Sequence, residues 1–157
     1  GQPSTRVVLL KLLWQDGLIF FTNYKSRKGR ELSINNKAAA LFFWPQLERQ
    51  VKIEGVISKV DPEISDQYFH SRPLESRISA LISQQSKEVE SKKVLEELWN
   101  EELEKWKDTN PPRPESWGGF RLKPTRIEFW QGGSHRLHDR IQYKQVAGNW
   151  VISRLAP

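Results

Sequence analysis

The sequence of 157 residues contains no cysteine, no methionine and no long apolar run. Without thiols, the chain has no disulfide, no thiolate metal ligand and no cysteine nucleophile. The longest apolar run, AAALFFW at residues 38–44, is far shorter than the ~20 residues that cross a bilayer. The first residues also lack the charged and then apolar layout of a secretory signal. We therefore expect no association with membranes and a cytoplasmic location, with an organelle as the alternative.

The sequence does have an excess of basic residues. Lysine and arginine number 25 against 19 acidic residues, which gives a formal net charge of +6. This excess is compatible with nucleic acid, an anionic membrane surface or phosphorylated small molecules as partners, and it does not choose among them. A length of 157 residues is typical of a single domain with its own core.

Runs of β-branched and aromatic residues predict a mainly β-structured chain with a helical middle. The expected strands are residues 5–14, 18–24, 38–44, 49–60, 120–131, 135–144 and 149–157, and the turn QDG joins the first two. The expected helices are residues 27–36, 62–71, 74–83 and 91–108. In the last helix, a stripe with helical spacing is typical of packing: Leu95, Trp99, Leu103 and Trp106. Six or seven mainly antiparallel strands with inserted helices indicate a β-barrel with α additions, an α+β fold.

The segment SRKG, residues 26–29, predicts a phosphate site. Ser26 is a typical helix N-cap, which places Arg27 and Lys28 in the first helical turn. Cations are unfavourable there because the helix dipole is positive at that end. An anion bound at the exposed N–H groups would reverse this penalty. The alternative is a pair of solvated surface charges.

The segment QYFHSRPLES, residues 67–76, predicts a second site of the same kind. Tyr68 and Arg72 are four residues apart and so adjoin on one helix face. Pro73 breaks that helix and opens the next, which places Ser76 near its start. A phenol, a guanidinium and a hydroxyl would then converge on a phosphate. The alternative is a helix end with an incidental arginine. The polar loop SQQS, residues 83–86, provides hydrogen-bonding groups suited to a heterocycle.

The densest polar and aromatic segment is IEFWQGGSHRLHDR, residues 127–140. QGG reads as a β-turn between two strands. If HRLHDRIQY is the returning strand, Arg136, His138 and Arg140 point to one face because strand side chains alternate. Two permanent cations around one titratable ring call for an anion or a polar ligand.

This segment resembles the signature of the pyridoxine (pyridoxamine) 5′-phosphate oxidases. The resemblance continues in order through RVVLLK, FFTNYKSRKGRELSINN, LFFWPQLERQVKIEG, YFHSRPLESRI, SQQS, SWGGFRL and SRLAP. It implies an FMN-binding split barrel that is active as a homodimer, with the flavin at the subunit interface. It also implies oxidation of pyridoxine or pyridoxamine 5′-phosphate to pyridoxal 5′-phosphate, in which O2 re-oxidises the flavin and yields H2O2.

The resemblance also assigns roles to individual residues. Those that fall where the family binds FMN are Arg6, Val7, Val8, Leu9, Phe21, Thr22, Arg27, Lys28, Gln50, Gln85, Ser86, Trp130 and Arg140. Those that fall where it holds the substrate are Lys11, Tyr68, Arg72 and Ser76 for the phosphate, and Arg136 with His138 for the ring end. Arg136 and His138 are therefore the candidate catalytic residues. No metal ligands are implied.

The family pattern predicts one FMN-binding split-barrel domain over residues 1–157, without the N-terminal helix and first strand that family members carry. Ser79 stands where the family usually has glycine, and Leu81 where it has an aromatic residue. Two other functions stay open. One is a related split-barrel flavin reductase with another substrate, and the other is a non-enzymatic basic barrel that binds RNA or retains pyridoxal phosphate. Two bound phosphates explain the basic excess without nucleic acid.

Overall fold

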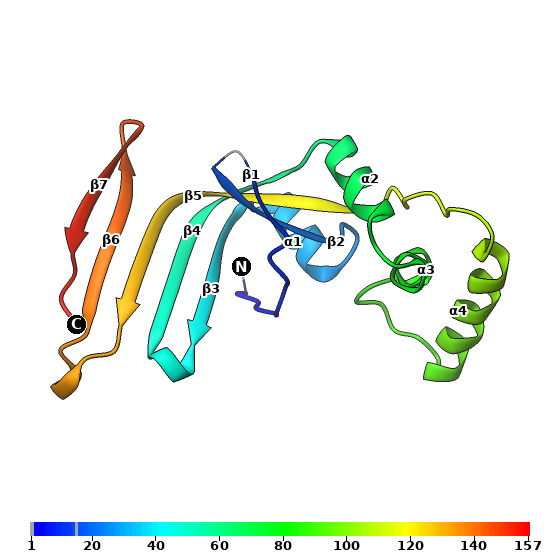
Figure 1. Cartoon of the computed structure of the whole chain (residues 1–157), viewed down its shortest axis with the longest axis horizontal. Helices are drawn as coiled ribbons and strands as arrows, with labels where there is room; N and C mark the ends of the chain where they lie inside the picture. Colours follow the sequence, from blue (N-terminus) through cyan, green and yellow to red (C-terminus); the bar gives the residue numbers. More distant parts are fainter. Residues whose placement is uncertain (1, 15) are drawn as a thin grey trace.

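The computed structural model describes residues 2–14 and 16–157. Gly1, and Gln15 of the expected QDG turn, lie outside the described residues. In chain order the elements are β1 (Leu12–Trp14), β2 (Gly17–Asn23), α1 (Arg27–Ile34), β3 (Lys37–Trp44), a 3₁₀ turn (Pro45–Leu47), β4 (Arg49–Lys59), α2 (Pro62–His70), α3 (Leu74–Ile82), α4 (Lys92–Trp106), β5 (Trp117–Gln131), a second 3₁₀ turn (Ser134–Arg136), β6 (Asp139–Val146) and β7 (Asn149–Arg154). Figure 1 shows the sheet extending to one side and α2, α3 and α4 gathered at the other.

The described strands form one seven-stranded antiparallel sheet, in which β5 is the central strand. One edge of β5 pairs with β4 along most of its length. The other edge pairs first with β2, up to Leu122, and then with β6, from Arg126 onward. Pro124 lies in the gap between these two ladders, where its missing N–H costs no hydrogen bond on that edge. A β-bulge at the same place shifts the register between Glu54 and Gly55 of β4.

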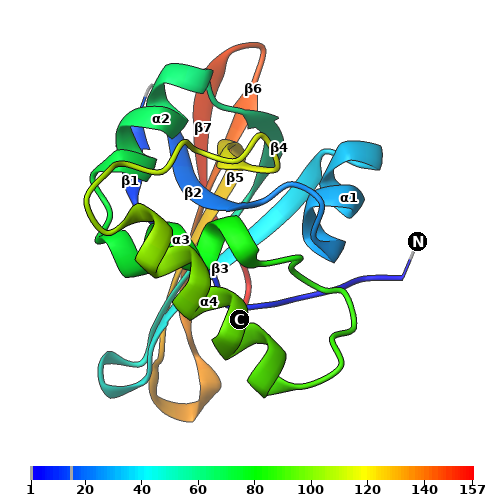
Figure 2. The ribbon, with the colours of Figure 1, turned by 90° about the vertical axis from the view of Figure 1, so that its right-hand side faces the viewer.

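Side chains on the two faces of β2 enter two different cores, because alternate residues of a strand point to opposite faces. Phe20 packs on the main core of Ile53, Ile57, Phe120 and Leu122, which Leu32 of α1 also contacts. Phe21 packs instead on the second cluster, formed by Phe69, Ala80 and Trp117. Figure 2 shows α1 and α2 on opposite sides of β2. β2 therefore carries neighbouring side chains into two different surroundings.

The stripe predicted on α4 is half-buried as expected, at Leu95, Trp99, Leu103 and Trp106. It faces α3 at Trp99, whose Nε1 donates a hydrogen bond to Ser79 Oγ at 3.1 Å. No helix of the described residues is long and apolar enough to cross a bilayer.

The first predicted strand, residues 5–14, is largely wrong. Only Leu12–Trp14 pairs with β2. One further backbone hydrogen bond precedes this pairing, from Lys11 N to Ile19 O at 2.9 Å. The preceding residues leave the sheet toward α1, where Ser4 and Arg6 contact Glu31. Polar anchoring of this segment to α1 replaces the strand pairing that its apolar sequence favours.

Arg113, in the connection between α4 and β5, joins α2 to the start of β5. Its Nε donates to Asp66 Oδ1 at 2.6 Å, and its Nη1 donates to the carbonyl oxygen of Trp117 at 2.7 Å. The Arg113 hydrogen bond is the main cause that holds the pKa of Asp66 below its usual range. This arginine therefore fixes the position at which Trp117 enters the sheet.

We predict that Arg113→Ala lowers the free energy of unfolding by about 1–2 kcal/mol, since it breaks a charge-assisted bond to a half-exposed carboxylate and leaves a carbonyl unpaired. The melting temperature should fall by roughly 3–6 °C. The contribution of the Asp66 carboxylate to the free energy of unfolding is fully present above about pH 4, the ordinary pKa of aspartate. It is lost as the pH falls through the lowered pKa of Asp66 in the folded state. Thermal melts over this pH range should show that the difference in melting temperature between the wild type and Arg113→Ala becomes smaller in acid.

Lys93→Ala is the matched control, because Lys93 forms an exposed ion pair with Glu97 at 3.6 Å. Such surface pairs contribute little, so its melting temperature should stay near that of the wild type. Equal losses in the two variants would contradict a specific role for Arg113.

Candidate functional site

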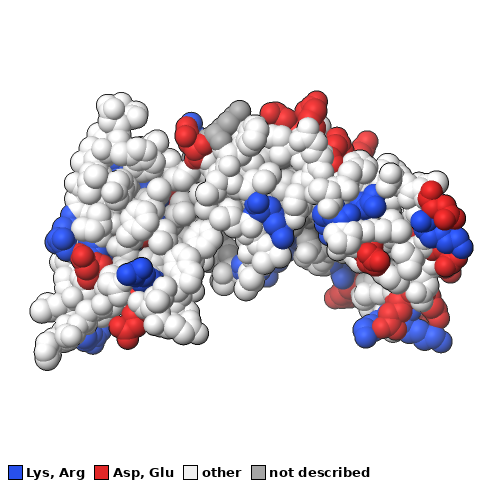
Figure 3. All heavy atoms as spheres, viewed as in Figure 1, with Lys and Arg blue, Asp and Glu red and all other residues white. Residues whose placement is uncertain are grey.

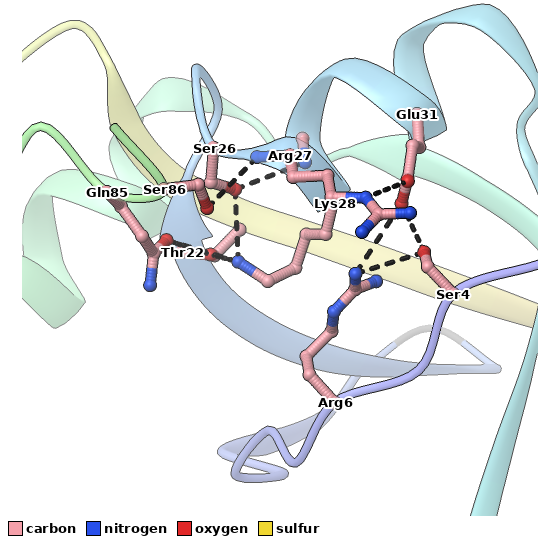
Figure 4. A network of polar contacts seen from close by, with 10 residues as sticks. Ser4, Arg6, Thr22, Ser26, Arg27, Lys28, Glu31, Gln85 and Ser86 are labelled. Atoms are coloured by element: carbon pink, nitrogen blue, oxygen red, sulfur yellow. Dashed lines mark hydrogen bonds and ion pairs between the residues drawn. The ribbon is translucent and has the colours of Figure 1, made fainter. Parts of the chain in front are cut away.

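The first group of predicted site residues gathers around the ammonium group of Lys28, at the start of α1 (Figure 4). Lys28 Nζ donates hydrogen bonds to Thr22 Oγ1, to Ser26 Oγ at 3.1 Å and to Gln85 Oε1 at 3.2 Å. We call Lys28, Thr22, Ser26 and Gln85 the Lys28 cluster. Its members come from α1, from β2 and from the loop after α3, so only the folded chain brings them together.

Local sequence explains why α1 begins here. Ser26 is the N-cap, as predicted, and its Oγ accepts a hydrogen bond from the backbone N–H of Gly29 at 3.2 Å. A Cβ at position 29 would lie 2.1 Å from the carbonyl oxygen of Tyr24. Only glycine permits this close approach, which seats the first turn of α1 against the end of β2. The helix ends at Ile34, two residues before the expected end.

The Lys28 side chain is buried, with 8% of the residue exposed. Among the described residues, no carboxylate lies within ion-pair distance of Lys28. Burial, and secondarily the positive charge of Arg6, lower the pKa of Lys28. A buried ammonium whose partners are all neutral oxygens favours a bound anion, which would supply the missing negative charge.

Two arginines extend this positive region outward. Arg27 donates its backbone N–H to Ser86 Oγ at 3.2 Å, and its Nε donates to Glu31 Oε1 at 2.8 Å. Arg6 lies 3.5 Å from Glu31 Oε2 through its Nη2. Figure 4 shows both guanidinium groups beside the Lys28 side chain. The structure thus brings together six residues that the family resemblance assigned to FMN: Arg6, Thr22, Arg27, Lys28, Gln85 and Ser86.

The second group lies on the other face of β2, in a stack of aromatic rings. The Phe21 ring lies 4.0 Å from the Tyr68 ring and 5.5 Å from the Trp117 ring, and all three are nearly parallel. The guanidinium carbon of Arg72 lies 4.9 Å from the centre of the Trp117 ring. We call Phe21, Tyr68, Arg72 and Trp117 the aromatic corner.

Arg72 is not on the same helix face as Tyr68, in contrast to the prediction, because α2 ends at His70 and Pro73 caps α3. Its side chain reaches the aromatic corner from the connection between the two helices. Burial lowers the pKa of Arg72. Its Nη1 atom is buried and has no hydrogen-bond partner among the described residues. A buried guanidinium nitrogen without an acceptor favours a bound oxyanion.

No side-chain hydrogen bond or ion pair among the described residues involves the other residues assigned to these two sites. Ser76 is half-buried in the first turn of α3, as predicted. Lys11 and the segment Val7–Leu9 are exposed in the extended chain before β1. Their positions leave them accessible to a ligand, and their predicted roles stay predictions.

The third group lies at the far end of β5. Gln50 of β4 pairs with Trp130 of β5, which pairs with Arg140 of β6, so all three side chains share one face of the sheet. Arg140 Nε donates to Glu128 Oε1 at 2.8 Å, and its Nη1 donates to the carbonyl oxygen of Ala156 at 2.7 Å. The three residues assigned to FMN here are therefore adjacent to one another.

Arg136 and His138 do not belong to the returning strand, and the prediction that they align with Arg140 is wrong. β6 begins only at Asp139, and residues 132–138 form a loop in place of the expected tight turn. His135 and Arg136 have positive φ angles of 55° and 63°, which strand residues do not adopt. The His138 ring instead packs on Trp130, with ring centres 4.8 Å apart. A loop of this kind positions Arg136 and His138 independently of strand alternation.

A single chain does not bring the aromatic corner and the 132–138 loop together. Trp117 and Trp130 lie thirteen residues apart on β5, which corresponds to roughly 40 Å along the strand. Figure 1 shows α2 and this loop on opposite sides of the molecule. The two sets of residues assigned to the substrate are therefore separated within one protomer.

Sequence reasoning missed three residues that contact predicted site residues. Glu31 accepts a hydrogen bond from Arg27 and forms an ion pair with Arg6. The ring of Trp117 contacts the Arg72 guanidinium, and Glu128 accepts a hydrogen bond from Arg140. Spacing alone could have indicated two of them. Glu31 is four residues after Arg27 on a helix, and Glu128 is two residues before Trp130 on a strand. Trp117 offered no comparable signal.

A family model described as pyridoxamine 5′-phosphate oxidase matches residues 1–131. A second one, described as the pyridoxine 5′-phosphate oxidase C-terminal dimerisation region, matches residues 117–157. The chain belongs to the pyridoxine/pyridoxamine 5′-phosphate oxidase family. This confirms the family resemblance. The family consists of oxidoreductases, and this chain contains the family's C-terminal dimerisation region.

Named relatives within the pyridoxine/pyridoxamine 5′-phosphate oxidase family align with the whole chain. The pyridoxine/pyridoxamine 5′-phosphate oxidase of Cupriavidus metallidurans is 56% identical over 158 residues, which cover 100% of this chain and 74% of the relative. The enzyme of the same name from Pseudomonas putida is 53% identical over 157 residues, covering 100% of this chain and 73% of the relative.

Two solved structures share the fold. PhzG from Burkholderia lata, in complex with tetrahydrophenazine-1-carboxylic acid, has a TM-score of 0.95 and 31% identity, and the alignment covers 100% of this chain and 77% of PhzG. A pyridoxamine 5′-phosphate oxidase-related, FMN-binding protein from Nostoc punctiforme has a TM-score of 0.77 and 13% identity, covering 100% of this chain and 82% of that protein. The predicted split barrel with helical additions is confirmed.

We predict that Lys28→Met, which keeps the length of the side chain and removes its charge, weakens the stabilisation of the fold by phosphate. In the wild type, inorganic phosphate bound near the ammonium should raise the melting temperature as its concentration passes the dissociation constant. The variant should show a much smaller rise, measured by thermal melts over a phosphate series.

Lys25→Met is the control, because Lys25 is exposed in the turn just before α1. Any general effect of salt will appear equally in this variant. If Lys28→Met and the wild type respond identically to phosphate, then the buried ammonium does not attract an anion.

Proposed function

We propose that this family member is an FMN-dependent oxidase that converts pyridoxine 5′-phosphate or pyridoxamine 5′-phosphate into pyridoxal 5′-phosphate, with O2 as acceptor and H2O2 as product. One observation carries the proposal: two cations without carboxylate partners among the described residues lie on the two faces of β2. They are the buried ammonium of Lys28 and the Arg72 guanidinium, whose Nη1 is buried. Two phosphates, one on FMN and one on the substrate, match these two positions.

The residues of the Lys28 cluster fit the phosphate of FMN. Lys28 and Arg27 offer positive charge at the start of α1, and Arg6 adds a third cation beside them. The hydroxyl of Ser86 and the amide of Gln85 lie at the rim, where they can hydrogen-bond a larger ligand. When bound, FMN supplies hydride acceptance from the substrate and reaction with O2. The protein itself needs no nucleophile for this chemistry.

The aromatic corner fits the phosphate of the vitamer. The buried Nη1 of Arg72 is available for a phosphate oxygen, and the Trp117 ring fixes the guanidinium in place. Tyr68 contributes a phenol to this corner, and the family resemblance adds the hydroxyl of Ser76 and the ammonium of Lys11. Holding the phosphate at one end orients the opposite end of the substrate, so that binding energy is used for positioning.

We further propose that the active form is a homodimer in which each site takes residues from both protomers. The separation between the aromatic corner and the 132–138 loop requires a second chain if Arg136 and His138 act on the substrate. The description of residues 117–157 as a dimerisation region supports this. So do exposed apolar side chains on β3 and β7: Leu41, Phe43, Trp150, Val151 and Ile152. In Figure 3, most of the surface over the sheet is neither acidic nor basic.

The direct test is to supply purified protein with FMN and each vitamer phosphate, and to follow pyridoxal 5′-phosphate by absorbance and H2O2 by a coupled assay. We predict that Arg72→Met raises KM for the phosphorylated substrates about 10²-fold, the effect of losing a charge-assisted contact of about 3 kcal/mol. Any turnover of non-phosphorylated pyridoxine should stay unchanged, because a substrate without a phosphate makes no use of Arg72.

Arg30→Met, an exposed position on α1, is the control and should behave as the wild type. Failure of flavin-loaded wild-type protein to oxidise either 5′-phosphate would contradict the proposal. It would favour an oxidase with another substrate, as the likeness to PhzG allows.

The shared site has a separate test. We predict that Arg72→Met and Arg136→Ala, each nearly inactive alone at substrate concentrations near the wild-type KM, regain activity when the two proteins are mixed and allowed to exchange subunits. Each mixed dimer then contains one site with both native residues and one site with neither. With random exchange, about a quarter of all sites are restored. No recovery in dimers that demonstrably exchange would show that one protomer supplies both residues.

A further inference from the structure

Glu128 is a buried carboxylate at the centre of the β4–β5–β6 face, with 4% of the residue exposed. It pairs across the sheet with Lys52 of β4. It lies two residues before Trp130 on β5, so the two side chains share one face of the sheet. Its Oε1 accepts a hydrogen bond from Arg140 Nε at 2.8 Å, and its Oε2 lies 3.4 Å from Lys52 Nζ. The Arg140 hydrogen bond is the largest cause that holds the pKa of Glu128 low.

Glu128 is also part of a longer series of alternating charges. Lys52 lies 3.3 Å from Glu54, and Glu54 lies 3.3 Å from Arg126. The outer members, Lys52, Glu54 and Arg126, are more than one-third exposed, and such pairs contribute little on their own. Glu128 differs because it is removed from water, and a buried carboxylate is costly unless its partners are fixed with good geometry. The series therefore has one rigid point, at Glu128 and Arg140.

Two contacts fix the plane of the Arg140 guanidinium. Glu128 accepts from Nε, and the carbonyl oxygen of Ala156 accepts from Nη1 at 2.7 Å. The backbone carbonyl of Arg140 in turn accepts from Leu155 N at 2.9 Å, so the segment after β7 is held against the same residue. Because a guanidinium is planar, two anchored nitrogens determine the direction of the third. Nη2 has no partner among the described residues and remains available to a ligand.

We propose that Glu128 is a positioning residue for the flavin: it holds Arg140 in the one orientation that presents Nη2 to the cofactor, alongside Trp130 and Gln50. This inference rests on the proposed function, in which Arg140 contacts FMN. Arg140 is only half-buried, and without Glu128 its long side chain would be free to occupy several rotamers. Glu128 touches neither substrate nor cofactor in this proposal and acts only through Arg140.

The test is a double-mutant cycle on FMN binding, measured by quenching of FMN fluorescence as apoprotein is titrated. Glu128→Gln keeps the shape of the side chain and removes its charge, and it should raise the Kd of FMN about tenfold. Arg140→Ala should raise the Kd at least as much. The double variant should bind no more weakly than Arg140→Ala alone, because a residue that acts through Arg140 has no effect once Arg140 is gone.

Glu54→Gln is the matched control, since Glu54 lies on the same face in the same series of charges and does not touch Arg140. It should bind FMN as the wild type does. Independent, additive losses in the double variant would overturn the proposal and assign Glu128 a general structural role. Wild-type affinity in Glu128→Gln, with weakened binding in Arg140→Ala, would overturn it as well.

Folding and the proposed function are judged separately. Thermal melts of each apoprotein show whether Glu128→Gln is folded, and Glu128→Asp, which keeps the charge but shortens the reach, replaces it if it is not. If neither variant folds, Glu128 serves folding and the proposal is wrong. Wild-type protein that binds no FMN contradicts the proposed function itself. Wild-type protein that binds FMN but oxidises no vitamer contradicts only the choice of substrate.

Discussion

Backbone hydrogen bonding along β5 determines where every part of the candidate site lies. Trp117, the first residue of the strand, belongs to the aromatic corner. Gly118 pairs with Thr22, which places the Lys28 cluster one residue further along. Trp130, near the other end, pairs with Gln50 and Arg140. A slip of one residue in this register would turn each of these side chains to the opposite face. The chemistry of the protein therefore depends first on the pairing of one strand.

The structure handles charge in two contrasting ways at the two ends of that strand. Near Trp130, the buried carboxylate of Glu128 is neutralised by Arg140 and Lys52, so that end carries its own counter-charges. Near Trp117, Lys28 and Arg72 have no carboxylate partner in the described part of the chain. Buried charge that is already paired is rigid, whereas buried charge that is unpaired attracts a ligand. The end near Trp130 is thus fixed by ion pairs within the chain, whereas the end near Trp117 offers unpaired charge to a ligand.

Features governed by local rules were predictable from the sequence. Ser26 caps α1 and Pro73 precedes α3 as expected, because capping and proline geometry depend on a few neighbouring residues. The 132–138 loop was not predictable, since positive φ angles at His135 and Arg136 contradict the local preference of those residues. The lack of strand pairing over the described residues before Leu12 was not predictable either, because Ser4 and Arg6 contact Glu31, a residue distant in the chain. Only the assembled fold shows such contacts.

Pro124 helps to prevent a strand of another molecule from pairing with the open edge of β5. β2 and β6 occupy the same edge of β5 in succession, and an interval of open edge lies between them. An open edge invites a strand from another molecule to add to the sheet, which is a common beginning of aggregation. Proline has no N–H to offer an intruding strand, and the bulge beside it breaks the regular spacing that such a strand would need. The interruption that divides the sheet into two halves also protects it from uncontrolled growth.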